Sequence, residues 1–239
     1  MHYLVLLYGD ETGAPEPGTP EFDAELAGYA AFDEHAAGAI RGGAALHLTE
    51  RARTIRHDGA AVTVTDGPFA ETTEVLGGYY VLECTDLDEV IELVRAIPAT
   101  SHPRSAAEVR PMLANEALRP EGEMLPDLWL ATLHRGGAPG TETGGAETGP
   151  GVHDAFVRAH RPQLVRVGTL HPATSATTVR VREGGLQVVD GPFDPRLAVV
   201  DGFYVLQADA DKAETLAREI PVGDGGAVEL RPIVDLTAM

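Results

Sequence analysis

The residues with the clearest chemical potential are two aspartates, each opening the same tetrapeptide. Asp66-Gly67-Pro68-Phe69 recurs later in the chain as Asp190-Gly191-Pro192-Phe193. Glycine can take a positive φ and proline fixes φ, so the pair predicts a rigid corner that holds the preceding carboxylate in place. Such a carboxylate could act as a general base or a hydrogen-bond acceptor for a ligand. It could equally accept backbone N–H groups and only hold the turn together, and the tetrapeptide does not separate these readings.

Two histidines are the second candidates, because each lies one strand upstream of its aspartate. They are His47 and His171, each preceded by leucine. A histidine beside a carboxylate is the usual general-base pair, in which the carboxylate orients the ring. Whether the residues meet depends on the geometry of the hairpin between them. A solvated histidine at a strand end is the alternative.

Two arginines precede proline in the last predicted strand of each copy. Arg110 and Arg231 could bind an anionic ligand, or they could pair across the copies with the matched Glu108 and Glu229. We favour the structural pairing. The residues expected to surround a ligand at the corners are Gly67, Pro68, Phe69, Glu71, Arg110, Gly191, Pro192, Phe193 and Arg231. Glu71 has no counterpart after the second corner, so any site is expected to be unequal in the two copies.

No metal or cofactor is expected. The nine histidines are scattered, and neither an HExxH nor a CxxC motif is present. His153 and His160 are interpreted as a coincidence on one helix face. The glycine clusters lack the strand-to-helix context of a phosphate-binding loop.

Composition limits the partners. The net charge of −19 makes the average surface repel nucleic acid and anionic lipid. Cys84 is the only cysteine, so no internal disulfide can form, which fits a reducing compartment. No stretch approaches the roughly 20 apolar residues of a membrane helix. We therefore expect a cytoplasmic protein without a nucleic-acid or membrane partner.

The chain repeats well beyond the tetrapeptide. Gly78-Tyr79-Tyr80-Val81-Leu82 matches Gly202-Phe203-Tyr204-Val205-Leu206, and the histidines and arginines above match in the same order. A repeat this long indicates two copies of one domain rather than a solenoid. We place the copies at residues 1–114 and 127–237, joined by a linker.

Within each copy, the periodicity predicts strands and helices in the order β-α-β-β-α-β, with a β-hairpin inserted after the second strand. This is a ferredoxin-like α+β fold. For the first copy the predicted hairpin spans residues 53–65, and helices begin at Thr19 and Asp86. The second copy is expected to have its hairpin at 177–189 and helices at 152–161 and 210–220.

Helices should cover one face of each sheet and leave the other bare. Tyr79, Val81 and their neighbours put apolar groups on both faces, so the bare face needs a partner. We expect the two sheets to pack face to face as an intrachain α/β barrel pseudodimer. A further homodimer stays possible.

Several segments of the first copy resemble the YCII-related DGPF-domain proteins. They are residues 1–11 (MHYLVLLYGDE), 64–72 (VTDGPFAET), 76–80 (LGGYY) and 109–112 (VRPM). The resemblance covers nearly the whole first copy and the second copy from about residue 164.

That resemblance implies a ferredoxin-like fold of the dimeric α/β barrel group in a bacterial cytoplasmic protein. It also implies a link to extracytoplasmic-function sigma factors. Related proteins are described as enzymes with a His–Asp pair, and one eliminates chloride from a chlorinated hydroquinone. Asp66 and Asp190 match the aspartate of that pair. The family histidine lies in the first helix, where this chain has Ala27 to Phe32, and the lysine after the DGPF motif is replaced by Thr73.

Two hypotheses follow. The leading one is a protein that binds a small organic molecule in a pocket between helix and sheet, near the corners. Asp66 would be its polar anchor and the general acid or base of a cofactor-free lyase- or isomerase-type reaction. The alternative is a non-enzymatic ligand-sensing or interaction protein of a transcription system. The sequence leaves open whether the protein is an enzyme.

Overall fold

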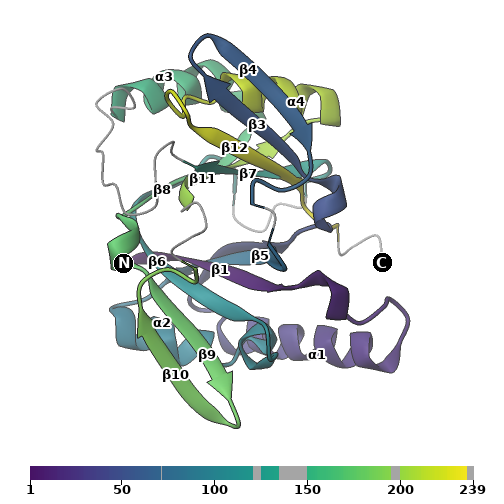
Figure 1. The fold of residues 1–239 in the computed structure, drawn as a ribbon. Coiled ribbons are helices and arrows are strands. Elements are labelled where there is room, and N and C mark those ends of the chain that lie inside the picture. The colour runs from purple at the N-terminus through teal and green to yellow at the C-terminus, as the bar shows by residue number, and fades with distance from the viewer. Residues whose placement is uncertain (71, 121–124, 135–149, 195–199, 236–239) are drawn as a thin grey trace. The chain divides into compact units, whose positions relative to one another are not determined.

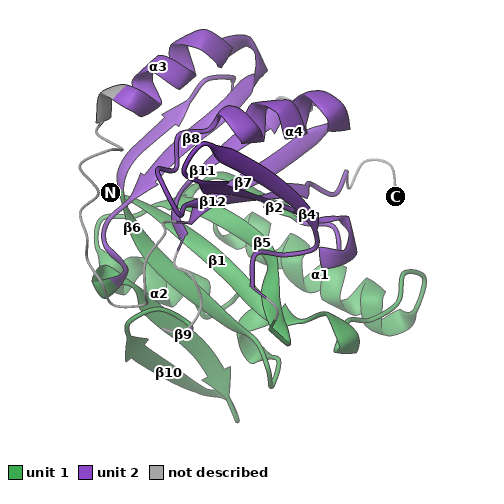
Figure 2. Cartoon of the chain, turned by 45° about the horizontal axis from the view of Figure 1, so that its top comes forward, with its two compact units in different colours: residues 1–45, 72–112, 174–193 green, residues 46–71, 113–173, 194–239 purple. Residues whose placement is uncertain are grey.

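The computed structural model describes the 239-residue chain except for residues 71, 121–124, 135–149, 195–199 and 236–239. The chain divides into two compact units, coloured separately in Figure 2. Unit 1 contains residues 1–45, 72–112 and 174–193, and unit 2 contains residues 46–71, 113–173 and 194–239. Each unit therefore combines segments from both predicted sequence copies.

Unit 1 is built on an antiparallel sheet with the strand order β2-β5-β1-β6-β9-β10. Helices α1 and α2 lie on one face of this sheet (Figure 1). The bounds are β1 (His2–Asp10), α1 (Pro20–His35), β2 (Ile40–Ala45), β5 (Glu74–Glu83), α2 (Leu87–Val94), β6 (Ala106–Ala117), β9 (Thr177–Arg182) and β10 (Gly185–Asp190). Strand β6 continues past residue 112 into unit 2.

Unit 2 repeats this plan with the strand order β8-β11-β7-β12-β3-β4, again antiparallel throughout. Helices α3 and α4 lie on one face (Figure 1). The bounds are β3 (Arg53–Asp58), β4 (Ala61–Asp66), β7 (Leu128–His134), α3 (Pro150–His160), β8 (Leu164–Leu170), β11 (Val200–Gln207), α4 (Ala210–Glu219) and β12 (Ala227–Pro232). The predicted α+β class is confirmed, and the antiparallel sheets with few helices are consistent with a ferredoxin-like order.

The helices begin where hydroxyl and carboxylate side chains can accept a backbone N–H. The Thr19 hydroxyl accepts from Phe22 N at 3.3 Å at the start of α1, and Asp86 accepts from Glu89 N at 3.0 Å at the start of α2. Asp209 does the same for α4, accepting from Lys212 N at 2.8 Å. The two predicted helix starts are thus confirmed.

Both predicted hairpins form, but each joins the sheet of the other copy's last strand. Hairpin β3–β4 pairs with β12, and hairpin β9–β10 pairs with β6. Each hairpin was expected to belong to its own copy, and the observed pairing corrects this expectation. The reason is physical: β6 and β12 carry the same Glu-(Val/Leu)-Arg-Pro pattern, so local pattern cannot decide which edge a hairpin joins.

Within regularly paired stretches, successive residues of a strand point to opposite faces of the sheet. In unit 1, Tyr3, Val5 and Leu7 belong to the core that includes Val90 and Val94 of α2. Leu4 and Leu6 face the other way, onto what we call the helix-free face.

The helix-free face carries charges from the last strands. In unit 1, Glu108 pairs with Leu6 and Arg110 pairs with Leu4, so both charged residues share that face. The buried Tyr79 and Val81 lie there too, because they pair with Leu6 and Leu4. This face therefore carries charged as well as apolar residues.

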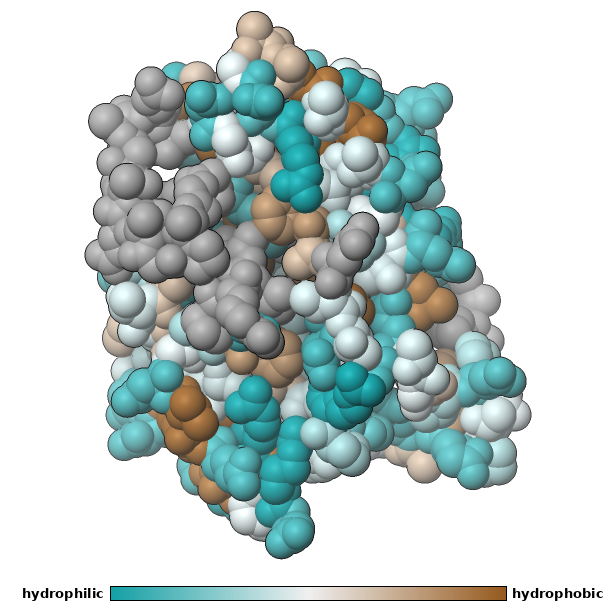
Figure 3. All heavy atoms as spheres, viewed as in Figure 1, coloured by the Kyte–Doolittle hydropathy of each residue, from teal (hydrophilic) through white to brown (hydrophobic). Residues whose placement is uncertain are grey.

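No helix among the described residues is long and apolar enough to cross a membrane. The surface drawn in Figure 3 is mostly hydrophilic, with apolar residues in small groups.

Candidate functional site

The first DGPF corner lies in unit 2 and is closed by strand β3. Gly67 has a φ of 102°, a conformation that favours glycine. Its N–H donates to the Ala52 carbonyl at 2.9 Å, and the Thr54 hydroxyl donates to the Gly67 carbonyl at 2.9 Å. Thr54 is 1% exposed. The turn is thus held by a buried threonine and by backbone.

The second corner, in unit 1, has the same construction. Gly191 has a φ of 107°, its N–H donates to the Ala176 carbonyl at 2.8 Å, and the Thr178 hydroxyl donates to its carbonyl at 2.9 Å. The half-buried Pro68 and Pro192 complete the two corners. Two segments far apart in the sequence therefore close one kind of turn by identical bonds.

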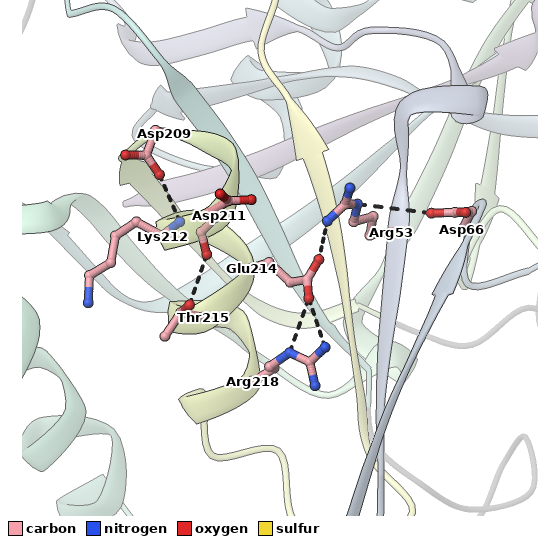
Figure 4. Close-up of polar contacts among 8 residues, drawn as sticks. All are labelled: Arg53, Asp66, Asp209, Asp211, Lys212, Glu214, Thr215 and Arg218. Carbon is pink, nitrogen blue, oxygen red and sulfur yellow. Dashed lines mark hydrogen bonds and ion pairs between the residues drawn. The ribbon is translucent and has the colours of Figure 1, made fainter.

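Asp66 points away from this bonding. Its side chain is 93% exposed, and its Oδ1 lies 4.0 Å from Nε of Arg53 (Figure 4). Arg53 and Asp66 are a cross-strand pair, and Arg53 also pairs with Glu214 of α4. Asp66 therefore lies on the helix side of the sheet. Asp190, its counterpart in unit 1, is also exposed.

Glu214 connects this edge of the sheet to α4. It binds Arg218 at 2.8 Å as well as Arg53 (Figure 4). The hydrogen bond from Arg218 is the main cause that lowers the pKa of Glu214; burial opposes it and Arg53 adds to it. Arg53 is replaced by Thr177 in the other hairpin, so this ion network belongs to unit 2.

At each corner a buried glutamate accepts a hydrogen bond from a backbone N–H. The Phe69 N–H donates to Oε2 of Glu229 at 2.9 Å, and the Phe193 N–H donates to Oε2 of Glu108 at 2.9 Å. The two glutamates are 9% and 4% exposed. Because each motif and its glutamate come from different sequence copies, every corner needs both copies.

Each glutamate also binds the arginine two residues further along its own strand. Arg110 Nη1 donates to Glu108 Oε1 at 3.1 Å, and Arg231 Nη1 donates to Glu229 Oε1 at 3.4 Å. Residues two apart on a strand share a face, which brings the charges together. Each of these Glu–Arg pairs thus forms within a single strand.

An aromatic stack covers the corner of unit 2. The Phe69 and His134 rings are parallel, with centroids 4.5 Å apart, and the guanidinium carbon of Arg56 lies 4.4 Å from the Phe69 centroid. Ala227 pairs with both His134 and Arg56, so the three form one row across β7, β12 and β3. The small alanine leaves room for the phenyl ring on the helix-free face, opposite Asp66.

Unit 1 has the equivalent stack. The Tyr8 and Phe193 rings are parallel at 4.8 Å, and the guanidinium carbon of Arg180 lies 5.3 Å from the Phe193 centroid. Tyr8 pairs with Ala106, the counterpart of Ala227. The ring that stacks on the phenylalanine is therefore a phenol (Tyr8) in unit 1 and an imidazole (His134) in unit 2.

The predicted histidines take other positions. The His47 carbonyl accepts from Arg231 Nε at 3.1 Å, and its ring nitrogens lie 3.2 and 3.3 Å from Nη1 of Arg51. Burial lowers the pKa of His47, and the charges of Arg51 and Arg231 lower it further. The contacts thus join His47 to Arg231 rather than to Asp66. His171 is half-buried in unit 2, whereas Asp190 belongs to unit 1.

The structure thus gathers part of the predicted site. Phe69 and Arg231 both bind Glu229, and Arg231 also binds the His47 carbonyl, whereas Asp66 lies on the other face of the sheet. Glu71 lies outside the described residues. Sequence reasoning missed Glu108, Glu229 and His134 as site residues; the only signal was the match of the two glutamates between copies.

The remaining candidates do not gather as a metal site. His153 Nδ1 lies 2.6 Å from the Tyr204 hydroxyl, and His160 Nε2 lies 3.0 Å from Glu219 Oε2. These histidines thus have separate partners. In the described part of the chain, no group of three or more His, Cys, Asp or Glu is arranged to hold a metal.

Comparison with known proteins supports the resemblance seen in the sequence. A family model described as the YCII-related domain matches residues 1–114. Uncharacterized protein R00369 of Rhizobium meliloti (strain 1021) is 34% identical over 126 residues, which cover 52% of this chain and 98% of that protein. The chain therefore belongs to the YCII-related family. The matched family model covers the first copy. The name of the relative states no activity.

Proposed function

We propose that this protein binds a small organic molecule at the corner of unit 2, next to Phe69, His134 and Glu229. One observation carries the proposal: a carboxylate, an imidazole and a guanidinium lie buried together there, at 9%, 6% and 2% exposure for Glu229, His134 and Arg231. Burying ionisable groups is costly, and such clusters are concentrated at functional sites. Unit 1 buries the same pair, with Glu108 and Arg110 at 4% and 0% exposure, but it has Tyr8 where unit 2 has His134, so the imidazole is what distinguishes the unit 2 corner.

The chemical part of the proposal is a cofactor-free lyase- or isomerase-type reaction with Asp66 as acid or base. The family resemblance supports this role for the aspartate of the motif, and Asp190 would have it in unit 1.

The second candidate is a non-enzymatic ligand-sensing or interaction protein, linked to an extracytoplasmic-function sigma factor. The position of Asp66 favours it. The carboxylate faces solvent and Arg53, on the side of the sheet opposite Phe69. In this role the protein is a cytoplasmic regulator that binds without turnover.

We also propose that residues 127–237 form a second YCII-like domain and that the halves make an intrachain dimeric α/β barrel. The equivalent bonds at Gly67 and Gly191, and at Glu229 and Glu108, support a common origin of the halves. The exchange of hairpins also supports this arrangement, because each hairpin pairs with the last strand of the other half.

The test is a panel of small aromatic and carboxylic acids, screened by thermal shift and followed by calorimetry. Binding should be lost in Glu229→Gln and retained in the matched unit 1 variant Glu108→Gln. Compounds that bind both variants as well as the unchanged protein would place the ligand elsewhere. A panel without any binder would favour the interaction role.

Turnover separates the two candidates once a binder is found. An enzyme using Asp66 should lose turnover in Asp66→Asn while keeping affinity. Unchanged turnover in this variant would remove Asp66 from the chemistry, and absence of turnover in the unchanged protein would favour the sensor.

A further inference from the structure

The two corners share a common plan, so their differences can be identified position by position. Strand pairing aligns Tyr8 and Ala106 in unit 1 with His134 and Ala227 in unit 2. The next row on the same face aligns Leu6 and Glu108 with Thr132 and Glu229. Within these rows the alanine and the glutamate are the same in both units. The two residues on the first strand differ: Leu6 and Tyr8 in unit 1 are replaced by Thr132 and His134 in unit 2.

Those two changes create one chemical feature. The Thr132 hydroxyl lies 3.0 Å from Nε2 of His134 and 3.5 Å from the carbonyl oxygen of Glu229. Thr132 and His134 are 3% and 6% exposed. A hydroxyl placed this way fixes the orientation of the ring and favours one tautomer. In unit 1 the corresponding residues are Leu6 and Tyr8, which carry no imidazole.

A merely structural role does not account for the pair. Tyr8 stacks on Phe193 with the same interplanar angle of 4° that His134 has on Phe69, so stacking does not require an imidazole. Replacing leucine by threonine at a buried position adds a polar group that must be satisfied. Both changes make sense together if the ring has to carry a proton.

We infer that His134 is the proton-carrying group of the unit 2 corner and that Thr132 is its positioning residue. This inference rests on the proposed binding function, but it does not depend on Asp66. His134 would take a proton from an acidic C–H or O–H of the ligand, which breaks that bond and leaves the electron pair on the ligand. The proton forms an N–H bond on the ring and returns to another ligand atom, so no co-reactant is needed.

The surroundings of the ring define what can affect its titration. Phe69 covers it from the turn and Thr132 neighbours it on β7. Across the sheet, Glu229 of β12 is one row away and Arg56 of β3 is in the same row.

The first test follows protonation in the ligand-free protein. Imidazole nitrogen signals of histidine-labelled protein are recorded by NMR from roughly pH 5 to 8, where histidines titrate. The His134 signal is identified by its loss in His134→Gln or, if that variant fails to fold, in His134→Tyr, which copies unit 1. We expect this signal to titrate while the fold persists, and Thr132→Val to shift its midpoint or tautomer.

A reciprocal variant provides the control. Leu6→Thr combined with Tyr8→His should add a titrating imidazole to unit 1. A His134 signal that stays constant over the whole range, in a folded protein whose other histidines titrate, would overturn the inference.

The second test uses any carbonyl compound found in the binding screen. Exchange of its acidic hydrogen for deuterium is followed in D2O, with the unchanged protein, His134→Gln and Asp66→Asn. We expect exchange to fall at least tenfold in His134→Gln, with affinity kept. Unchanged exchange in that variant would reject the role of His134 while leaving ligand binding intact. Failure of the screen would reject the binding function and leave the first test to decide the titration.

Discussion

Glu229 accepts a hydrogen bond at 2.9 Å from the backbone N–H of Phe69, a residue 160 positions earlier in the chain. Glu108 makes the same bond with Phe193. In both cases the carboxylate also binds an arginine of its own strand. The DGPF motif is therefore completed by a residue outside it, and the glutamate is the acceptor that links hairpin and sheet.

The first prediction concerns this link. Glu229→Ala should lower the free energy of unfolding by about 3–5 kcal/mol, because it leaves the buried Arg231 without its carboxylate. Glu229→Gln should cost less, since the amide oxygen can still accept from Phe69. Urea unfolding monitored by fluorescence gives both values, and the exposed Glu116→Ala is the control. Equal stability of Glu229→Ala and the unchanged protein would contradict the role of the carboxylate.

The second prediction separates threonine from aspartate in holding the turn. Thr54→Val should cost about 1 kcal/mol, because it removes a buried hydrogen bond to the Gly67 carbonyl. Asp66→Asn should change stability by less than about 0.5 kcal/mol, since its long ion pair with Arg53 is largely in solvent. Thermal melts of the two variants decide, with Thr178→Val as the equivalent in unit 1. A larger loss in Asp66→Asn than in Thr54→Val would show that the aspartate closes the turn.

The third prediction concerns the backbone of the corner. Gly67→Ala should destabilise the protein by about 1–3 kcal/mol, because alanine is strained at a φ of 102°. Space is not the cause, since no atom lies within 4 Å of the position a Cβ would take. Gly38→Ala is the matched control, because Gly38 has the same open surroundings without a positive φ. Equal melting temperatures of the two variants would argue against strain.

The fourth prediction uses the lowered pKa of His47. The unfolded state, whose histidine has its ordinary pKa, takes up a proton at higher pH than the folded state does. This contribution to stability is therefore present above the unfolded pKa, roughly 6.5, and is lost as pH falls through the folded pKa. Between about pH 8 and 5 the protein should lose more stability than its His47→Gln variant does. Parallel slopes in denaturant titrations would mean that folding does not shift this pKa.

The fifth prediction concerns the exchanged hairpins. A protease site inserted after Pro120 and then cut should leave the two halves associated, because β3 pairs with β12 and β9 pairs with β6. Size-exclusion chromatography before and after cleavage gives the result. Urea should be needed to separate the fragments, and spontaneous separation in buffer would contradict the exchange.

The sequence allowed much of the fold to be predicted. Alternating residues on either side of Asp58-Gly59 predicted the first hairpin, and the capping residues Thr19 and Asp86 predicted the helix starts. These features depend on neighbours in the sequence. The partner edge of the hairpin depends on tertiary pairing, and the matching patterns around Glu108 and Glu229 made both edges equally suitable.

The site was predictable only where a motif marked it. The turn at Gly67 follows from its own residues, but its closure by Thr54 and Glu229 depends on strands that are distant in sequence. His134 gave no signal of its own, since one aromatic residue replaces another at the end of a strand. Only the row formed with Ala227 and Arg56 shows that it covers Phe69.

The exchange of hairpins also limits how the two halves can evolve. A duplicated domain is usually free to change while its twin keeps the original role. Here the corner of unit 2 takes Phe69 from the first half and His134 and Glu229 from the second. A mutation in one half therefore changes a corner that the other half also builds. Neither half can acquire a new role at that corner without affecting the other.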